Sequence, residues 1–135
     1  MKATASIQLS VAAVVLLLAC NAFAKGKEKE KDKDGNVTVA GSIADSQCAF
    51  NVHSSGRSHD WMIKTGVPGA SDDKSCTNHC VKDMGGSFVL VAKDEVYRLD
   101  DQTYAERFAG AKVKVTGTLD PKTKTLHVRV IEENH

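Results

Sequence analysis

The sequence predicts a small, mainly β domain with two short helices. Residues 37–43 and 112–119 alternate apolar and polar side chains with the period of two that is typical of half-buried strands. Residues 88–99 hold an apolar run and a returning apolar segment around a tight turn, which is a hairpin pattern. The order is strand, long excursion with a helix, strand, strand, helix, strand, strand. This order predicts a five-stranded OB-fold-like small barrel, and an open five-stranded sheet is the main alternative.

The first 24 residues have the features of an export signal. Lys2 precedes an apolar core over residues 11–19 that is too short to span a bilayer comfortably, so no transmembrane span is expected. An A-x-A-like cleavage sequence occupies residues 22–24, whereas L-L-A-C at residues 17–20 resembles a bacterial lipobox and makes Cys20 a lipidation candidate. We therefore expect a signal peptide over residues 1–24. The protein is then periplasmic or secreted, or anchored to the membrane as a lipoprotein through Cys20.

The distribution of charge indicates a linker and argues against nucleic acid as a partner. The full chain has a formal charge of +1, and Lys2 is the only charged residue of the leader, so removal of the leader leaves +1 − 1 = 0. With no basic surplus, we predict no nucleic-acid binding. Residues 25–36 begin with the run KGKEKEKDKD, which predicts a charged, disordered linker. The barrel domain is expected over residues 37–133.

The first part of the domain combines a strand with a long loop. Gly41 lies on the apolar face of the first strand, which suggests a bulge or a close backbone approach. Asp45 then ends this strand and is expected to form a local Asx-type turn. Residues 49–74 lack periodicity and are rich in turn formers, so they predict a long loop. Residues 61–63 are expected to fasten this loop to the barrel as a hydrophobic patch.

Two helices separate the remaining strands. Residues 75–84 predict the first helix, with Asp73 or Ser75 as its N-cap and a pair of glycines as its stop. The second helix begins after Asp100 or Asp101 and places two aromatic residues four positions apart. The five strands are expected over residues 37–43, 88–92, 95–99, 112–119 and 126–130.

Three sequence phrases stand together in this chain. They are G-x-I-x-D-S-x-C at residues 41–48, C-T-x-x-C-V-K-x-x-G at residues 76–85 and V-T-G-T at residues 115–118. With them the chain resembles a group of small exported bacterial proteins that share a domain of unknown function. The resemblance covers residues 37–131 and implies an OB-like barrel behind an export signal. It implies no activity.

The predicted domain contains three cysteines, Cys48, Cys76 and Cys80, which are the disulfide candidates. An odd number in an exported chain allows one internal disulfide and leaves one thiol. Cys76 and Cys80 are four residues apart on the predicted helix, where β-carbons are roughly 5–6 Å apart, whereas a disulfide needs about 3.5–4.5 Å. Cys48 is therefore expected to bond to Cys76 or Cys80, and the closed loop would add roughly 3 kcal/mol of stability.

A metal site is the first alternative. Cys48, Cys76 and Cys80 would supply three thiolates, a set that with one histidine suits zinc, whereas thiolates alone also suit Cu(I). The fourth ligand would be His53, His59 or His79. His53 is expected to be a better fourth ligand than His79, because His79 would point away from the cysteines of its own helix. The C-x3-C spacing differs from the usual C-x2-C of zinc fingers.

Thiol redox chemistry is the second alternative. A thiol near a helix N-terminus would have a lowered pKa, but C-x3-C is not the C-x-x-C motif and no thioredoxin-like pattern accompanies it. His59 and Asp60 lack the nucleophile-elbow motif of a hydrolase. The sequence thus predicts a non-enzymatic, exported binding or structural module that needs no cofactor. Its partner is a small ligand or a protein that the sequence does not identify.

Overall fold

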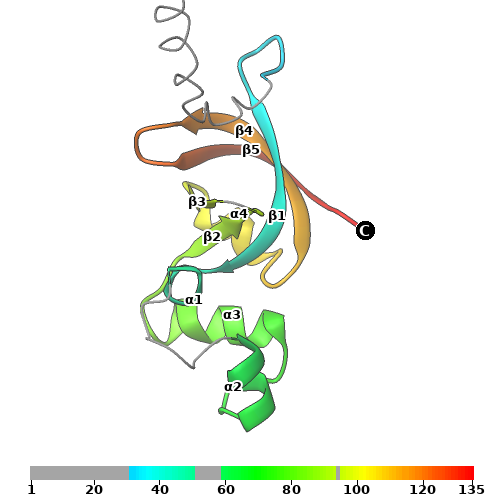
Figure 1. Ribbon diagram of the computed structural model, residues 1–135. Coiled ribbons are helices and arrows are strands. Elements are labelled where there is room, and N and C mark those ends of the chain that lie inside the picture. The colour runs from blue at the N-terminus through cyan, green and yellow to red at the C-terminus, as the bar shows by residue number, and fades with distance from the viewer. Residues whose placement is uncertain (1–30, 51–58, 94) are drawn as a thin grey trace, which may run out of the picture.

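The computed structural model describes residues 31–50, 59–93 and 95–135 (Figure 1). The predicted signal peptide, with Cys20, and the candidate ligand His53 lie outside the described residues. The elements are β1 (Val37–Asp45), α1 (Ser46–Ala49), α2 (His59–Thr65), α3 (Asp73–Lys82), β2 (Phe88–Val91), β3 (Val96–Leu99), α4 (Gln102–Glu106), β4 (Lys112–Asp120) and β5 (Thr125–Glu133). Among these residues, no helix is long and apolar enough to cross a membrane.

The five strands form one sheet with a closed ring of hydrogen bonds. Their order is β1-β2-β3-β5-β4, and β4 pairs back with β1. All neighbouring strands are antiparallel except β3 and β5, which are parallel. The prediction of a mainly β chain with five strands and a β2–β3 hairpin is confirmed.

The alternating strand residues build the hydrophobic core. On β1, for example, Val37, Val39 and Ile43 are buried while Thr38 and Ala40 are exposed. Burial of side chains of this size is worth roughly 1.5–3 kcal/mol each, so the core is the main source of stability. The largest of its fully buried members are Val37, Ile43, Leu90, Tyr97, Val113, Val115 and Leu126.

Two strand glycines allow backbones to approach closely. A β-carbon on Gly41 would overlap the carbonyl group of Val91 on β2, with 2.9 Å to its carbon atom. The predicted close approach at this position is therefore confirmed. A β-carbon on Gly117 would overlap the carbonyl oxygen of His127, beside a register shift that the sequence did not predict.

The helices differ from the prediction in number, since the described residues form four helices rather than two. The interval predicted as a loop contains α2, whose seven residues are too few to show a helical period. Within α2, Met62 is buried, whereas Trp61 is 43% exposed, so only part of the expected apolar patch faces inward. We call α1, α2 and α3 the helical cap, because Figure 1 shows them together at one end of the sheet.

The two predicted helices are confirmed with corrected ends. The N-cap of α3 is Asp72, not Asp73 or Ser75: its carboxylate accepts the Ser75 backbone N–H at 2.7 Å. Ser75 in turn accepts the Asp72 N–H at 2.9 Å, which completes a capping box. The N-cap of α4 is Asp101, as one of the two predicted candidates.

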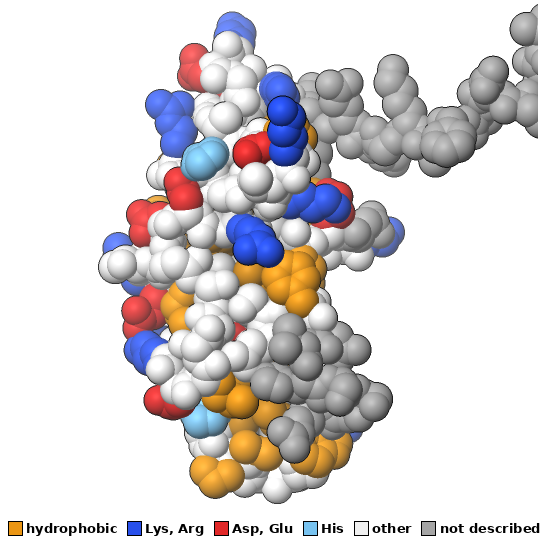
Figure 2. Space-filling model, turned by 90° about the vertical axis from the view of Figure 1, so that its left-hand side faces the viewer, with side chains coloured by type: hydrophobic (Ala, Val, Ile, Leu, Met, Phe, Trp, Pro, Cys, Tyr) orange, Lys and Arg blue, Asp and Glu red, His pale blue; other side chains and the backbone are white. Residues whose placement is uncertain are grey.

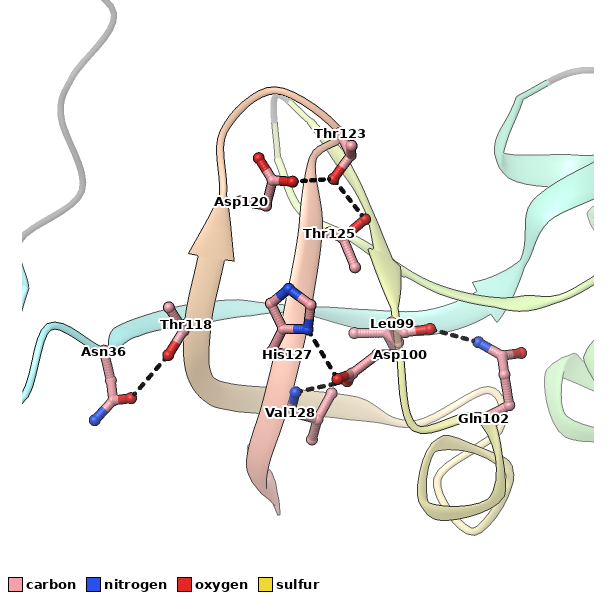
Figure 3. A network of polar contacts seen from close by, with 10 residues as sticks. All are labelled: Asn36, Leu99, Asp100, Gln102, Thr118, Asp120, Thr123, Thr125, His127 and Val128. Carbon is pink, nitrogen blue, oxygen red and sulfur yellow. Dashed lines mark hydrogen bonds and ion pairs between the residues drawn. The ribbon is translucent and has the colours of Figure 1, made fainter.

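Polar contacts join β3 to β5 at their parallel pairing (Figure 3). The Asp100 carboxylate accepts the Val128 backbone N–H at 2.8 Å and contacts Nδ1 of His127 at 3.0 Å. Next to β1, the Thr118 hydroxyl lies 3.5 Å from the side-chain oxygen of the buried Asn36. These contacts satisfy polar groups at strand ends and hold the strands in register.

Candidate functional site

A cluster of sulfur and carboxylate groups lies between the helical cap and the sheet. We call Asp45, Cys48, Cys76 and Cys80 the cysteine cluster. Asp45 is the last residue of β1, Cys48 belongs to α1, and the other two cysteines belong to α3. Asp45, Cys76 and Cys80 are fully buried, and Cys48 is half-buried. Groups far apart in the sequence therefore meet in one largely enclosed place.

The turn from β1 into α1 brings the first two members together. Asp45 is the N-cap of α1, so its side chain accepts a backbone N–H from the first helical turn. That donor is the N–H of Cys48, at 2.8 Å from Oδ1. The expected local turn at Asp45 is thus a helix cap, and the cap places a carboxylate beside a thiol.

The chain that follows α3 brings Cys80 to the same place. The Gly86 N–H donates to the Cys80 carbonyl at 3.0 Å, which ends the helix. Ser87 then bonds to Ser46 at the start of α1, since the Ser46 N–H donates to its carbonyl at 2.8 Å. The first turn of α3 lies against Gly110, where a β-carbon would be 2.6 Å from the Lys74 nitrogen. Both ends of α3 are therefore held against the sheet.

Three of the four ligating atoms of the cluster are close to one another. A carboxylate oxygen of Asp45 and the sulfur atoms of Cys48 and Cys80 all lie within 4.8 Å of each other. Cys76 and Cys80 are buried four residues apart on α3, so their side chains are neighbours on one face of the helix. Among the described residues, no disulfide joins these cysteines.

Burial and the neighbouring carboxylate raise the pKa of all three thiols. For Cys76, burial is the largest cause and the charges of Cys80 and Asp45 follow, and together they raise the pKa to about 12. Burial and Asp45 also raise the pKa of Cys48 and of Cys80. The expected lowered pKa near a helix N-terminus is therefore wrong, because desolvation and a like charge favour the neutral thiol.

Of the predicted histidine ligands, His79 does not join this cluster. Nδ1 of His79 pairs with the Asp83 carboxylate at 2.7 Å, as expected for a side chain that points away from Cys76 and Cys80. His79 also lies against Gly69, where a β-carbon would be 2.9 Å from the imidazole ring.

Asp45 is the member of the cluster that sequence reasoning missed as a candidate ligand. The signal was present in the spacing D-x-x-C at residues 45–48. An Asp N-cap accepts the backbone N–H of the second or third helical residue, so a cysteine at the third position has its backbone next to the carboxylate. Cys48 is that third residue, and the cap geometry therefore predicts the pair.

The helical cap also carries exposed apolar side chains. Phe50, Trp61 and Met84 are 47%, 43% and 41% exposed. The guanidinium of Arg98 lies 5.9 Å from the centre of the Phe50 ring. Figure 2 shows hydrophobic side chains gathered toward the lower end of one face, whereas charged side chains are spread over its upper part.

No protein-family model, curated protein or solved structure matches this chain. The resemblance to small exported proteins with a domain of unknown function therefore stays a prediction, and function is argued from the cysteine cluster.

Proposed function

We propose that the protein is an exported, non-enzymatic binding or structural module, in which the cysteine cluster fastens the helical cap to an OB-like barrel. The strand order β1-β2-β3-β5-β4, with α4 between β3 and β4, supports the barrel. Export is supported by the apolar leader and its cleavage sequence. A lipid on Cys20 remains the alternative to cleavage after Ala24.

One observation carries the proposal, the convergence of the Cys48 and Cys80 sulfur atoms within 4.8 Å. In an oxidising compartment this pair forms the disulfide, and Cys76 keeps its thiol. The pairing closes a loop from residue 48 to residue 80, which in the chain-entropy model adds roughly 3–4 kcal/mol of stability. The bond would hold α3 against the end of β1.

The thiol chemistry supports a structural role over a catalytic one. Catalysis by cysteine needs a thiolate, which enzymes obtain by lowering the thiol pKa. Here burial raises the pKa of Cys48, the member of the cluster that solvent reaches, and the charge of Asp45 raises it further. A thiol of this kind serves in a cross-link that forms once during folding.

Chemical denaturation of the oxidised and reduced protein tests this function. We expect the oxidised wild-type chain, from residue 25 on, to be more stable than the reduced chain by roughly 3–4 kcal/mol. Cys48→Ser and Cys80→Ser should each abolish the difference, while Cys76→Ser should keep it. Comparing the two redox states within each variant cancels the cost of placing a serine in a buried site. Equal stability of oxidised and reduced wild-type protein would contradict the proposal.

A further inference from the structure

We propose that the reduced cysteine cluster is a zinc site, in which Asp45, Cys48, Cys80 and Cys76 bind one Zn²⁺ ion. This inference goes beyond the disulfide, because it concerns the state in which all three thiols are reduced. It shares with the proposed function only the idea that the cluster fastens the helical cap. The ion would then join the same segments of β1, α1 and α3 that the disulfide joins after oxidation.

The distances fit a tetrahedral ion after small side-chain rotations. Zinc bonds to sulfur at about 2.3 Å and to carboxylate oxygen at about 2.0 Å. In a tetrahedron these bonds put sulfur atoms about 3.8 Å apart, and sulfur about 3.5 Å from oxygen. The observed atoms of Asp45, Cys48 and Cys80 are within 4.8 Å of one another, so inward shifts of about 1 Å are sufficient.

The fourth ligand is Cys76. It lies one helical turn before Cys80 among the buried residues of α3, next to the group formed by Asp45, Cys48 and Cys80. Side chains at positions i and i+4 of a helix are neighbours, so both sulfur atoms can reach one ion. The same geometry that prevents a disulfide between them therefore favours shared coordination.

The mixture of donors selects the metal. Calcium and magnesium prefer oxygen ligands, and Cu(I) prefers sulfur alone, whereas zinc accepts thiolate and carboxylate together. A bound divalent cation would also compensate the negative charge that Asp45 and the thiolates concentrate in a buried place. Cys48 is the half-buried member and gives the ion a route from solvent. The ligand atoms, the negative charge of the site and its access to solvent thus all favour Zn²⁺.

Zinc binding must displace protons from the thiols. Cysteine binds zinc as the thiolate, so each thiol must lose its proton. Binding of the ion therefore releases protons, and zinc affinity is expected to fall as the pH is lowered.

The test uses untagged, reduced wild-type protein that has been stripped with a chelator. We expect one equivalent of Zn²⁺ per chain in a titration against a chromogenic chelator. Co²⁺ in its place should give thiolate-to-metal charge-transfer absorption and the intense visible bands of a tetrahedral site. No retained zinc, or a Co²⁺ spectrum without thiolate bands, would overturn the proposal. These two readouts need no variant to fold.

Variants then identify the ligands. Cys80→Ser should weaken zinc binding at least 100-fold, and Cys76→Ser should change the Co²⁺ spectrum. Asp45→Asn keeps the α1 cap and should still weaken zinc binding at least tenfold. Asp83→Asn is the matched control, because it removes an exposed carboxylate that pairs with His79 outside the cluster. Equal zinc affinity in Asp45→Asn and Asp83→Asn would exclude Asp45 as a ligand and contradict the four-ligand site. Loss of the disulfide in oxidised protein would leave this result unchanged, so the two proposals can fail separately.

Discussion

Replacing Asp45 with asparagine should activate the Cys48 thiol. The carboxylate of Asp45 lies within 4.8 Å of the Cys48 sulfur and raises its pKa, second only to burial. Asparagine still accepts the Cys48 N–H as an N-cap, so the local structure is kept while the charge is lost. The pKa of Cys48 must then fall toward that of an ordinary thiol, although burial still keeps it raised.

The size of the effect follows from the distance between the two groups. At an effective dielectric constant of about 20, charges 4.8 Å apart interact by about 332/(20 × 4.8), or roughly 3.5 kcal/mol. Cys48 is half-buried, and solvent screening reduces this value by at least half. About 1.4 kcal/mol corresponds to a tenfold change in the thiolate population. We therefore expect a roughly tenfold faster reaction of Cys48.

The assay is the rate of alkylation by iodoacetamide at pH 8, on reduced protein with a chelator present. Cys76 and Cys80 are fully buried, so Cys48 is the described cysteine that the reagent reaches in the folded state. Asp83→Asn serves as the control and should react at the wild-type rate. If Asp45→Asn also reacts at the wild-type rate, the carboxylate and the thiol are not neighbours and the geometry of the cluster is wrong.

Two further predictions concern stability. Gly41→Ala should destabilise the fold by about 1–3 kcal/mol, because its β-carbon would overlap the Val91 carbonyl group; urea denaturation should show no comparable loss for Ser42→Ala. Partial burial alone would raise the pKa of Asp100, but the Val128 N–H and other partners lower it below its ordinary value of 3.8. The ionised Asp100 carboxylate therefore adds to the free energy of unfolding above pH 3.8, and this stabilisation is lost as the pH falls further. Compared with the wild type, Asp100→Asn should be less stable at pH 7 and should lose less stability on acidification to pH 3. An unchanged acid sensitivity would refute this role.

The strands were predictable because each carries a local pattern. The alternation of apolar and polar residues on β1 and β4 predicts which side chains face inward. A glycine among the inward-facing positions, Gly41, predicts a close approach of another backbone. The parallel pairing of β3 with β5 has no such local code, since it depends on how the chain closes the ring. Short helices such as α1, with four residues, show no period and are stabilised by tertiary contacts.

The candidate site was predictable in part for the same reasons. The spacing of Cys76 and Cys80 predicted that both would share one helix face, which is confirmed by their common burial on α3. The approach of Cys48 to Cys80 depends on the hydrogen bonds between Ser46 and Ser87, which join segments distant in sequence. The raised thiol pKa values could not be predicted from residue types alone, because they arise from burial and from the position of Asp45.

Disulfide mapping of the exported protein tests the central claim most directly. The protein is alkylated without reduction and digested with trypsin, which should give one peptide of residues 34–57 with Cys48 and one of residues 75–82 with Cys76 and Cys80. We predict that these two peptides are joined, and that fragment ions place the alkyl group on Cys76 and the disulfide on Cys80. An alkyl group on Cys80 with Cys48 bonded to Cys76, or alkylation of all three cysteines, would contradict the account.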